Sequence, residues 1–162
     1  MDPLPRQNID TGMGLERMAR VIQGVPTNFD IDAFRPLMRA VSDLCEVDLQ
    51  EDDEDIPAVR KIADHSRAVF FCIADGVIPS NEERGYVVRR LLRRAVREAA
   101  LQGAEEPFFC SLLDPVIEGF GHQYPELEEA REHIETVASQ EEESFQKTVK
   151  RGSELLNQYI AD

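Results

Sequence analysis

The sequence has little of several features that would assign it to a familiar class. No apolar run approaches the roughly 18 residues needed to cross a bilayer, so no membrane span is expected. The first residues lack the basic start and apolar run of a secretory signal, which favours a cytoplasmic location. The three cysteines are far apart and form no CxxC pair, so we expect neither disulfides nor a metal site and interpret them as buried thiols: Cys45, Cys72 and Cys110.

Basic residues are also scarce. The chain has 18 Lys and Arg against 32 Asp and Glu, and its formal net charge is -14. This balance argues against nucleic-acid binding, because affinity for phosphates comes from neutralising them. The distribution of charge is uneven, however, since residues 41–58 and 98–126 contain no base, whereas residues 84–97 contain six arginines and no acid. Such a basic stripe can accept an anion, or it can be a solvated face that pairs with the neighbouring acids.

Hydrophobic periodicity predicts an all-α fold, a multi-helix bundle with a long C-terminal helix and at most a residual strand at the N-terminus. Gly24 and Gly76 are expected to end two helices, and Pro36 must lie in the first turn of another or break it. The acidic segment 48–57 is expected to be a mobile loop. The expected helices cover residues 15–24, 30–47, 58–76, 80–101, 107–119 and 125–160.

The last expected helix is long for so small a chain. At roughly 1.5 Å per residue it would span about 50 Å, so we expect it to project from the body or to form one arm of a helical hairpin or coiled coil. Glu141 interrupts its apolar spacing.

The helix expected over residues 80–101 separates its side chains by type. Ser80 followed by Glu83 matches a capping box, which predicts Ser80 as the N-cap and Asn81 as the first helical residue. At about 100° per residue, the apolar side chains share one face, and five arginines fall on the opposite face without overlap: Arg89, Arg90, Arg93, Arg94 and Arg97. Guanidinium groups suit oxyanions, and the helix N-terminus adds positive potential beside Asn81. The pattern indicates a surface for structured nucleic acid formed by Arg84, Arg89, Arg90, Arg93, Arg94 and Arg97.

A glycine-containing segment, DTGMGLERM, lies near the N-terminus. Gly12 and Gly14 precede a helix with Arg17 one turn in, and Asp10 supplies a carboxylate at the turn. It is neither a dinucleotide fingerprint, because the third glycine and the following strand are missing, nor a P-loop, because GK[ST] is missing. Arg17 could meet a nucleotide phosphate if other parts of a site were present, but a simple helix N-cap is the more common explanation of such a segment.

Two stretches closely resemble the alanyl-tRNA synthetase family of class II aminoacyl-tRNA synthetases, namely NIDTGMGLERM and IADHSRAVFFCIADGVIPSNEERGYVVRRLLRRAVR. The resemblance implies that GMGLER begins class II motif 3, with Gly12, Gly14 and Arg17 in the ATP site and Arg17 on a phosphate. It implies that Asp10 receives the amino group of alanine. It also implies that Asn81 reads the G·U pair in the acceptor stem of alanine tRNA and that the arginine helix belongs to the tRNA-recognition domain.

The resemblance further implies how the chain is divided. Residues 1–28 correspond to the end of the catalytic domain and residues 29–162 to the helical tRNA-recognition domain. Motifs 1 and 2 would precede residue 1. An aspartate that helps to read the G·U pair, and then the editing domain, would follow Asp162, so discrimination by this chain alone should be poor.

We therefore expect a part of an alanine–tRNA ligase, an ATP-dependent enzyme, that is inactive by itself. The expected partners are the acceptor stem of alanine tRNA and the missing catalytic and editing parts, with no membrane and no DNA. ATP with Mg²⁺ would serve the full-length enzyme, and no cofactor is expected on this chain. Two other readings stay open: a helical protein-interaction module that uses the long helix, and a stand-alone alanine-activating enzyme, which would lack the sheet needed to position its groups.

Overall fold

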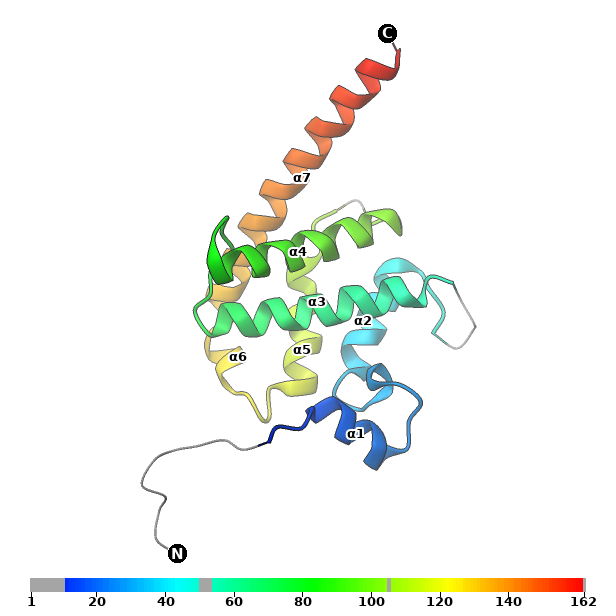
Figure 1. The fold of residues 1–162 in the computed structure, drawn as a ribbon, viewed down its shortest axis with the longest axis vertical. Coiled ribbons are helices and arrows are strands. Elements are labelled where there is room, and N and C mark those ends of the chain that lie inside the picture. The colour runs from blue at the N-terminus through cyan, green and yellow to red at the C-terminus, as the bar shows by residue number, and fades with distance from the viewer. Residues whose placement is uncertain (1–10, 50–53, 105, 162) are drawn as a thin grey trace, which may run out of the picture.

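The computed structural model describes residues 11–49, 54–104 and 106–161. Within these ranges every regular element is helical and no strand occurs, which confirms the all-α prediction (Figure 1). The elements in chain order are α1 (Leu15–Gln23), η1 (Asn28–Asp30), α2 (Arg35–Cys45), α3 (Ile56–Ala74), α4 (Glu83–Leu101), η2 (Phe109–Leu112), α5 (Leu113–Phe120), α6 (Glu126–Glu129) and α7 (Arg131–Ala161), where η denotes a 3₁₀ turn.

The core lies around α3, which packs along α4 and also contacts α2, α5 and α7 (Figure 1). Aromatic rings join these helices in edge-to-face pairs, which adds directional contacts to the apolar burial. Phe34 meets Phe120 with 5.6 Å between ring centroids, and Phe70 meets Phe109 at 5.1 Å. The buried face of α4 is the predicted one, formed by Val88, Leu92, Ala95, Val96 and Ala99 with Leu91 half-buried.

Helix ends follow the local signals in most places. Gly24 ends α1 with a φ of 64°, and Gly76 follows α3 with a φ of 81°, conformations that glycine adopts without a steric penalty. Pro36 lies in the first turn of α2, as predicted. That helix begins at Arg35 rather than residue 30, because Thr27 and Asp30 form a capping box that closes the 3₁₀ turn η1 first.

Two helices that were predicted to be continuous are divided. The helix predicted over residues 107–119 is split into η2 and α5, where the buried Glu142 of α7 accepts hydrogen bonds from the Phe108 and Phe109 amides. The helix predicted over residues 125–160 is split at Ala130 into α6 and α7. Next to this break, Arg131 Nη1 donates a hydrogen bond to Asp114 Oδ1 of α5 at 2.6 Å. The backbone bond from the amide of Ile134 to the Ala130 carbonyl keeps the helical spacing across the break, which explains why periodicity does not reveal it.

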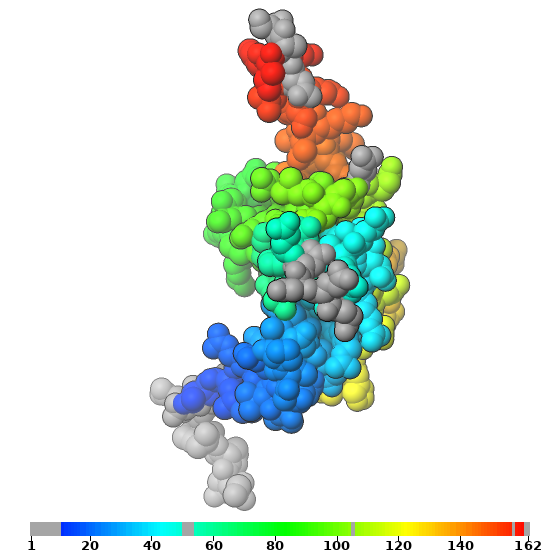
Figure 2. Space-filling model, turned by 90° about the vertical axis from the view of Figure 1, so that its right-hand side faces the viewer, coloured from blue at the N-terminus to red at the C-terminus, as the bar shows by residue number. Residues whose placement is uncertain are grey.

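The outer part of α7 projects from the body, as predicted. Its inner turns are buried through Ile134 and Ala138, whereas residues 147–156 are exposed throughout (Figures 1 and 2). Within the described ranges, no helix is long and apolar enough to span a bilayer. Residues 50–53 of the predicted acidic loop lie outside the described residues, and the division of the chain at residue 28 stays a prediction.

Candidate nucleic-acid interface

The segment that carries Asn81 is a closed turn and not the first turn of a helix. The Ser80 amide donates to the Gly85 carbonyl at 3.0 Å, and the Ser80 hydroxyl bonds to the carbonyl and the amide of Glu82. This local side-chain bonding replaces the predicted capping box. Glu82 is the N-cap and α4 begins at Glu83, so the prediction that Ser80 caps a helix starting at Asn81 is wrong.

Gly85 allows this turn to close. A Cβ at this position would lie 2.9 Å from Ser80 Cβ and nearer still to Ser80 Oγ and the Ile78 carbonyl oxygen, which no real side chain tolerates. Glu83, two residues before Gly85, has a φ of 47°, a left-handed conformation that is costly for a residue with a side chain. The turn is therefore held in a strained shape by its packing. Sequence reasoning missed Gly85, although an isolated glycine inside a helical pattern costs about 1 kcal/mol relative to alanine and points to a packing reason.

Asn81 is exposed on this turn, and its Oδ1 accepts a hydrogen bond from Arg89 Nη1 at 2.5 Å. Arg89 also pairs with Glu141 of α7, whose side chain is only 8 % exposed, with 3.0 Å between Nη2 and Oε2. The second oxygen of Glu141 accepts from Arg93 Nε at 2.7 Å, and the Arg93 guanidinium lies 5.2 Å from the centroid of the Phe145 ring. These contacts connect the turn, α4 and α7 in one network.

The network corrects the prediction that arginines and packed surface do not overlap on α4. Arg89 and Arg93 are only 23 % and 33 % exposed and hold the buried carboxylate of Glu141, because α7 passes along this side of α4. The other arginines of the stripe are exposed and make no ion pair within the described residues: Arg84, Arg90, Arg94 and Arg97. Spacings of four and seven residues place Arg90, Arg94 and Arg97 on one side of α4.

The glycine segment lies away from this surface. Figures 1 and 2 place α1 and α4 at opposite ends of the body, separated by α3. Gly14 is the N-cap of α1, and a Cβ there would make only an ordinary van der Waals contact with Arg17, 3.4 Å from its Cδ. Arg17 is exposed, and a Cβ on Gly12 would meet nothing within 4 Å. Asp10 lies outside the described residues.

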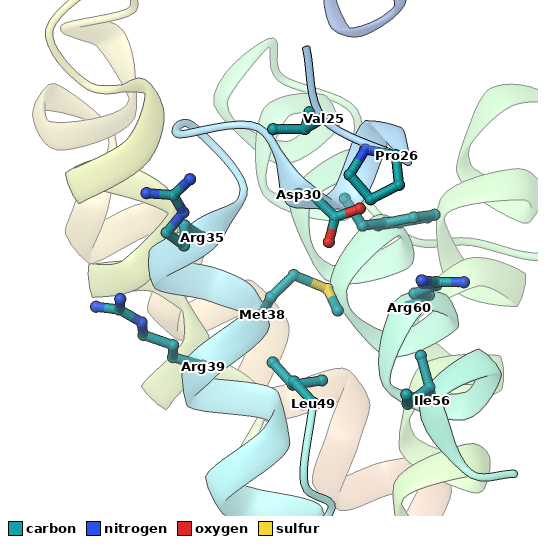
Figure 3. A pocket seen from close by; sticks show the side chains of 10 residues that line it. Val25, Pro26, Asp30, Arg35, Met38, Arg39, Leu49, Ile56 and Arg60 are labelled. Carbon is teal, nitrogen blue, oxygen red and sulfur yellow. The ribbon is translucent and has the colours of Figure 1, made fainter. Parts of the chain in front are cut away.

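A hollow of about 450 Å³ between η1, α2 and the start of α3 contains three arginines that the sequence did not single out. Figure 3 shows Arg35 and Arg39 extending to one side of its centre, at Met38, and Arg60 extending to the other. The Arg60 guanidinium lies 5.7 Å from the centroid of the Phe29 ring. Because the three guanidinium groups do not point toward one another, the hollow does not form an anion-binding site.

The three cysteines are free thiols, of which Cys45 is buried, as predicted, whereas Cys72 and Cys110 are only half-buried. Burial, with a smaller contribution from the charge of Asp55, raises the pKa of Cys45 to about 11, so this thiol stays protonated at neutral pH. Burial also raises the pKa of the half-buried Cys72 and Cys110. Among the residues that the structure describes, no group of three or more His, Cys, Asp or Glu side chains could hold a metal ion.

Comparison with known proteins identifies the family. The model of class II (A) tRNA synthetases matches residues 1–162. The chain is 51 % identical over 159 residues to the alanine–tRNA ligase of Pseudothermotoga lettingae, 51 % over 160 residues to that of Desulforudis audaxviator and 50 % over 160 residues to that of Pelotomaculum thermopropionicum. These alignments cover 98–99 % of the chain but only 18 % of each relative. The chain belongs to the class II tRNA synthetases and matches one segment of the alanine–tRNA ligases.

Proposed function

We propose that the chain binds the acceptor stem of alanine tRNA as the tRNA-recognition part of a cytoplasmic alanine–tRNA ligase. One observation carries this proposal. An exposed asparagine stands on a strained, closed turn at the head of a row of exposed arginines, in a chain whose formal net charge is -14. A basic row that makes no ion pair among the described residues, despite the many acids of the chain, is suited to an anionic partner.

The two parts of the surface have different tasks in this proposal. The exposed arginines contact backbone phosphates, which fix position and supply affinity but carry no sequence information. Asn81 reaches the wide, shallow minor groove of the RNA duplex, where base edges and 2′-hydroxyls are accessible, and reads the G·U pair. Four arginines of the stripe are available for phosphates in this proposal, in place of the six expected from the sequence.

In the full-length enzyme, Gly12, Gly14 and Arg17 would form part of the ATP site, with Mg²⁺ on the nucleotide, and Asp10 would receive the amino group of alanine. The exposed position of Arg17 supports the view that this site needs the rest of the catalytic domain. Adenylate formation depends on positioning the two substrates, which an isolated motif cannot provide. The catalytic and editing parts of the ligase are accordingly proposed to act together with this segment.

The proposal is tested by titrating the chain with an acceptor-stem hairpin at several salt concentrations. Replacing one exposed arginine, in Arg94→Ala, should weaken binding and lower the slope of log K against log salt by about one. Arg39→Ala is the matched control, since it removes the same charge from α2 and should leave the slope unchanged. Equal losses in the two variants would mean that the charge of the chain, and not this surface, determines binding.

A further inference from the structure

We infer that Arg89, held by Glu141 of α7, positions the carboxamide of Asn81 so that its NH₂ group, and not its oxygen, faces the RNA. The inference rests on the proposed function and deepens it, because it identifies a residue that determines specificity without touching the RNA. Its physical basis is the network that joins the turn, α4 and α7.

The orientation of the carboxamide follows from the chemistry of its neighbour. A guanidinium group has only donors, so the Asn81 atom that it contacts must be the oxygen. Arg89 Nη1 lies 2.5 Å from Asn81 Oδ1, which leaves Nδ2 without an acceptor among the described residues. The assignment of oxygen and nitrogen, which is ambiguous for most exposed asparagines, is determined here by the donor beside it.

Arg89 is itself fixed from the opposite side. Its Nη2 pairs with Glu141, and the same carboxylate binds Arg93, so each oxygen of Glu141 holds one arginine. Charge-assisted hydrogen bonds to a carboxylate that is only 8 % exposed are stronger than bonds made in water. The planar fork of Arg89 binds Asn81 and Glu141 at once, which the single ammonium group of a lysine would not reproduce.

The consequence for recognition is a defined polarity. The minor-groove edges of base pairs present the acceptors O2 and N3 and, on guanine, the donor N2–H₂. An Asn81 whose oxygen is occupied by Arg89 presents donors, so it suits an acceptor such as uracil O2 or a ribose 2′-hydroxyl. Asn81 free to rotate would present either group and would discriminate less.

Two readouts on the whole chain test the inference. The first is the ratio of affinities for acceptor-stem hairpins with a G·U and with a G·C pair. Arg89→Lys should lower this ratio about 2- to 12-fold, the loss expected of one hydrogen bond, and so should Asn81→Ala. Arg94→Lys is the matched control and should preserve the ratio. Asn81→Asp keeps an acceptor for Arg89 but removes the donor, so it should abolish the preference.

The second readout needs no RNA. The NMR signals of the Asn81 Nδ2 amide should shift in Arg89→Lys and in Glu141→Gln, and they should stay in place in Arg94→Lys. Thermal unfolding of each variant shows whether the chain is still folded. If Glu141→Gln does not fold, Arg89→Lys still tests the inference.

The outcomes separate the inference from the proposed function. If Asn81→Ala lowers the ratio and Arg89→Lys does not, Asn81 reads the pair without Arg89, and the inference alone is overturned. A G·U preference that survives in Asn81→Asp overturns the donor assignment. If Asn81→Ala leaves the ratio unchanged, the base-reading part of the proposed function is wrong, and the inference is rejected with it.

Discussion

Replacing Gly85 by alanine should destabilise the protein, although the same change in an ordinary helix stabilises it. The new Cβ would overlap the Ile78 carbonyl oxygen and the Ser80 side chain, and overpacking of this kind costs about 1–3 kcal/mol. Opening the turn would also weaken the bond from the Ser80 amide to the Gly85 carbonyl, worth about 1 kcal/mol. Alanine recovers about 1 kcal/mol through its helix propensity. The net loss is about 1–3 kcal/mol.

Thermal unfolding followed by circular dichroism measures this loss, since each kcal/mol lowers the Tm of a chain of this size by about 2–4 °C. Gly152→Ala is the matched control. A Cβ at Gly152 meets nothing within 4 Å, so the change should be neutral or stabilising by up to about 1 kcal/mol. If Gly85→Ala melted at or above the wild-type temperature, the turn would not be closed as described. The displaced turn should also reduce the preference for the G·U hairpin.

Three further outcomes are expected. Burial raises the pKa of Glu142 above its ordinary value of 4.5, so its stabilising contribution is complete below that value and is lost as the pH rises through the folded-state pKa. Urea unfolding should show Glu142→Gln gaining stability relative to the wild type from about pH 4.5 towards neutrality, and a pH-independent difference would contradict this. Arg93→Ala should lower the Tm but leave the salt slope of RNA binding nearly unchanged, unlike Arg94→Ala. The chain should show no alanine-dependent ATP–pyrophosphate exchange. Clear exchange would mean that these residues activate alanine without the rest of the catalytic domain, contrary to the proposal.

Much of the fold could be predicted because its determinants are local. Apolar spacing identified the helices, and Gly24 and Gly76 marked helix ends, since a single residue decides each backbone conformation. The start of α4 was misplaced because the capping-box pattern of Ser80 and Glu83 competes with a bond from the Ser80 amide to Gly85. The break at Ala130 was missed because it preserves the helical period.

The candidate site was only partly accessible from the sequence. Periodicity located the arginines, but it did not show that Arg89 and Arg93 pair with Glu141 while the others stay exposed. Glu141 is 48 residues beyond Arg93, and in the sequence it only interrupts an apolar pattern. Charge pairing across such a separation is a tertiary effect that a local pattern does not encode. Asn81 was singled out by the family resemblance, and its contact with Arg89 emerged from the structure.

The role of Asn81 is tested by following its side-chain amide by NMR while the chain is titrated with the G·U and G·C hairpins. This measurement does not require a large difference in affinity between the two hairpins. The Nδ2 signals of Asn81 should shift differently with the two hairpins, whereas the guanidinium signals of Arg90 and Arg94 should shift alike with both. An Asn81 amide that responds identically to the two hairpins, or to neither, would contradict the claim that Asn81 reads the base pair while the arginines hold the backbone.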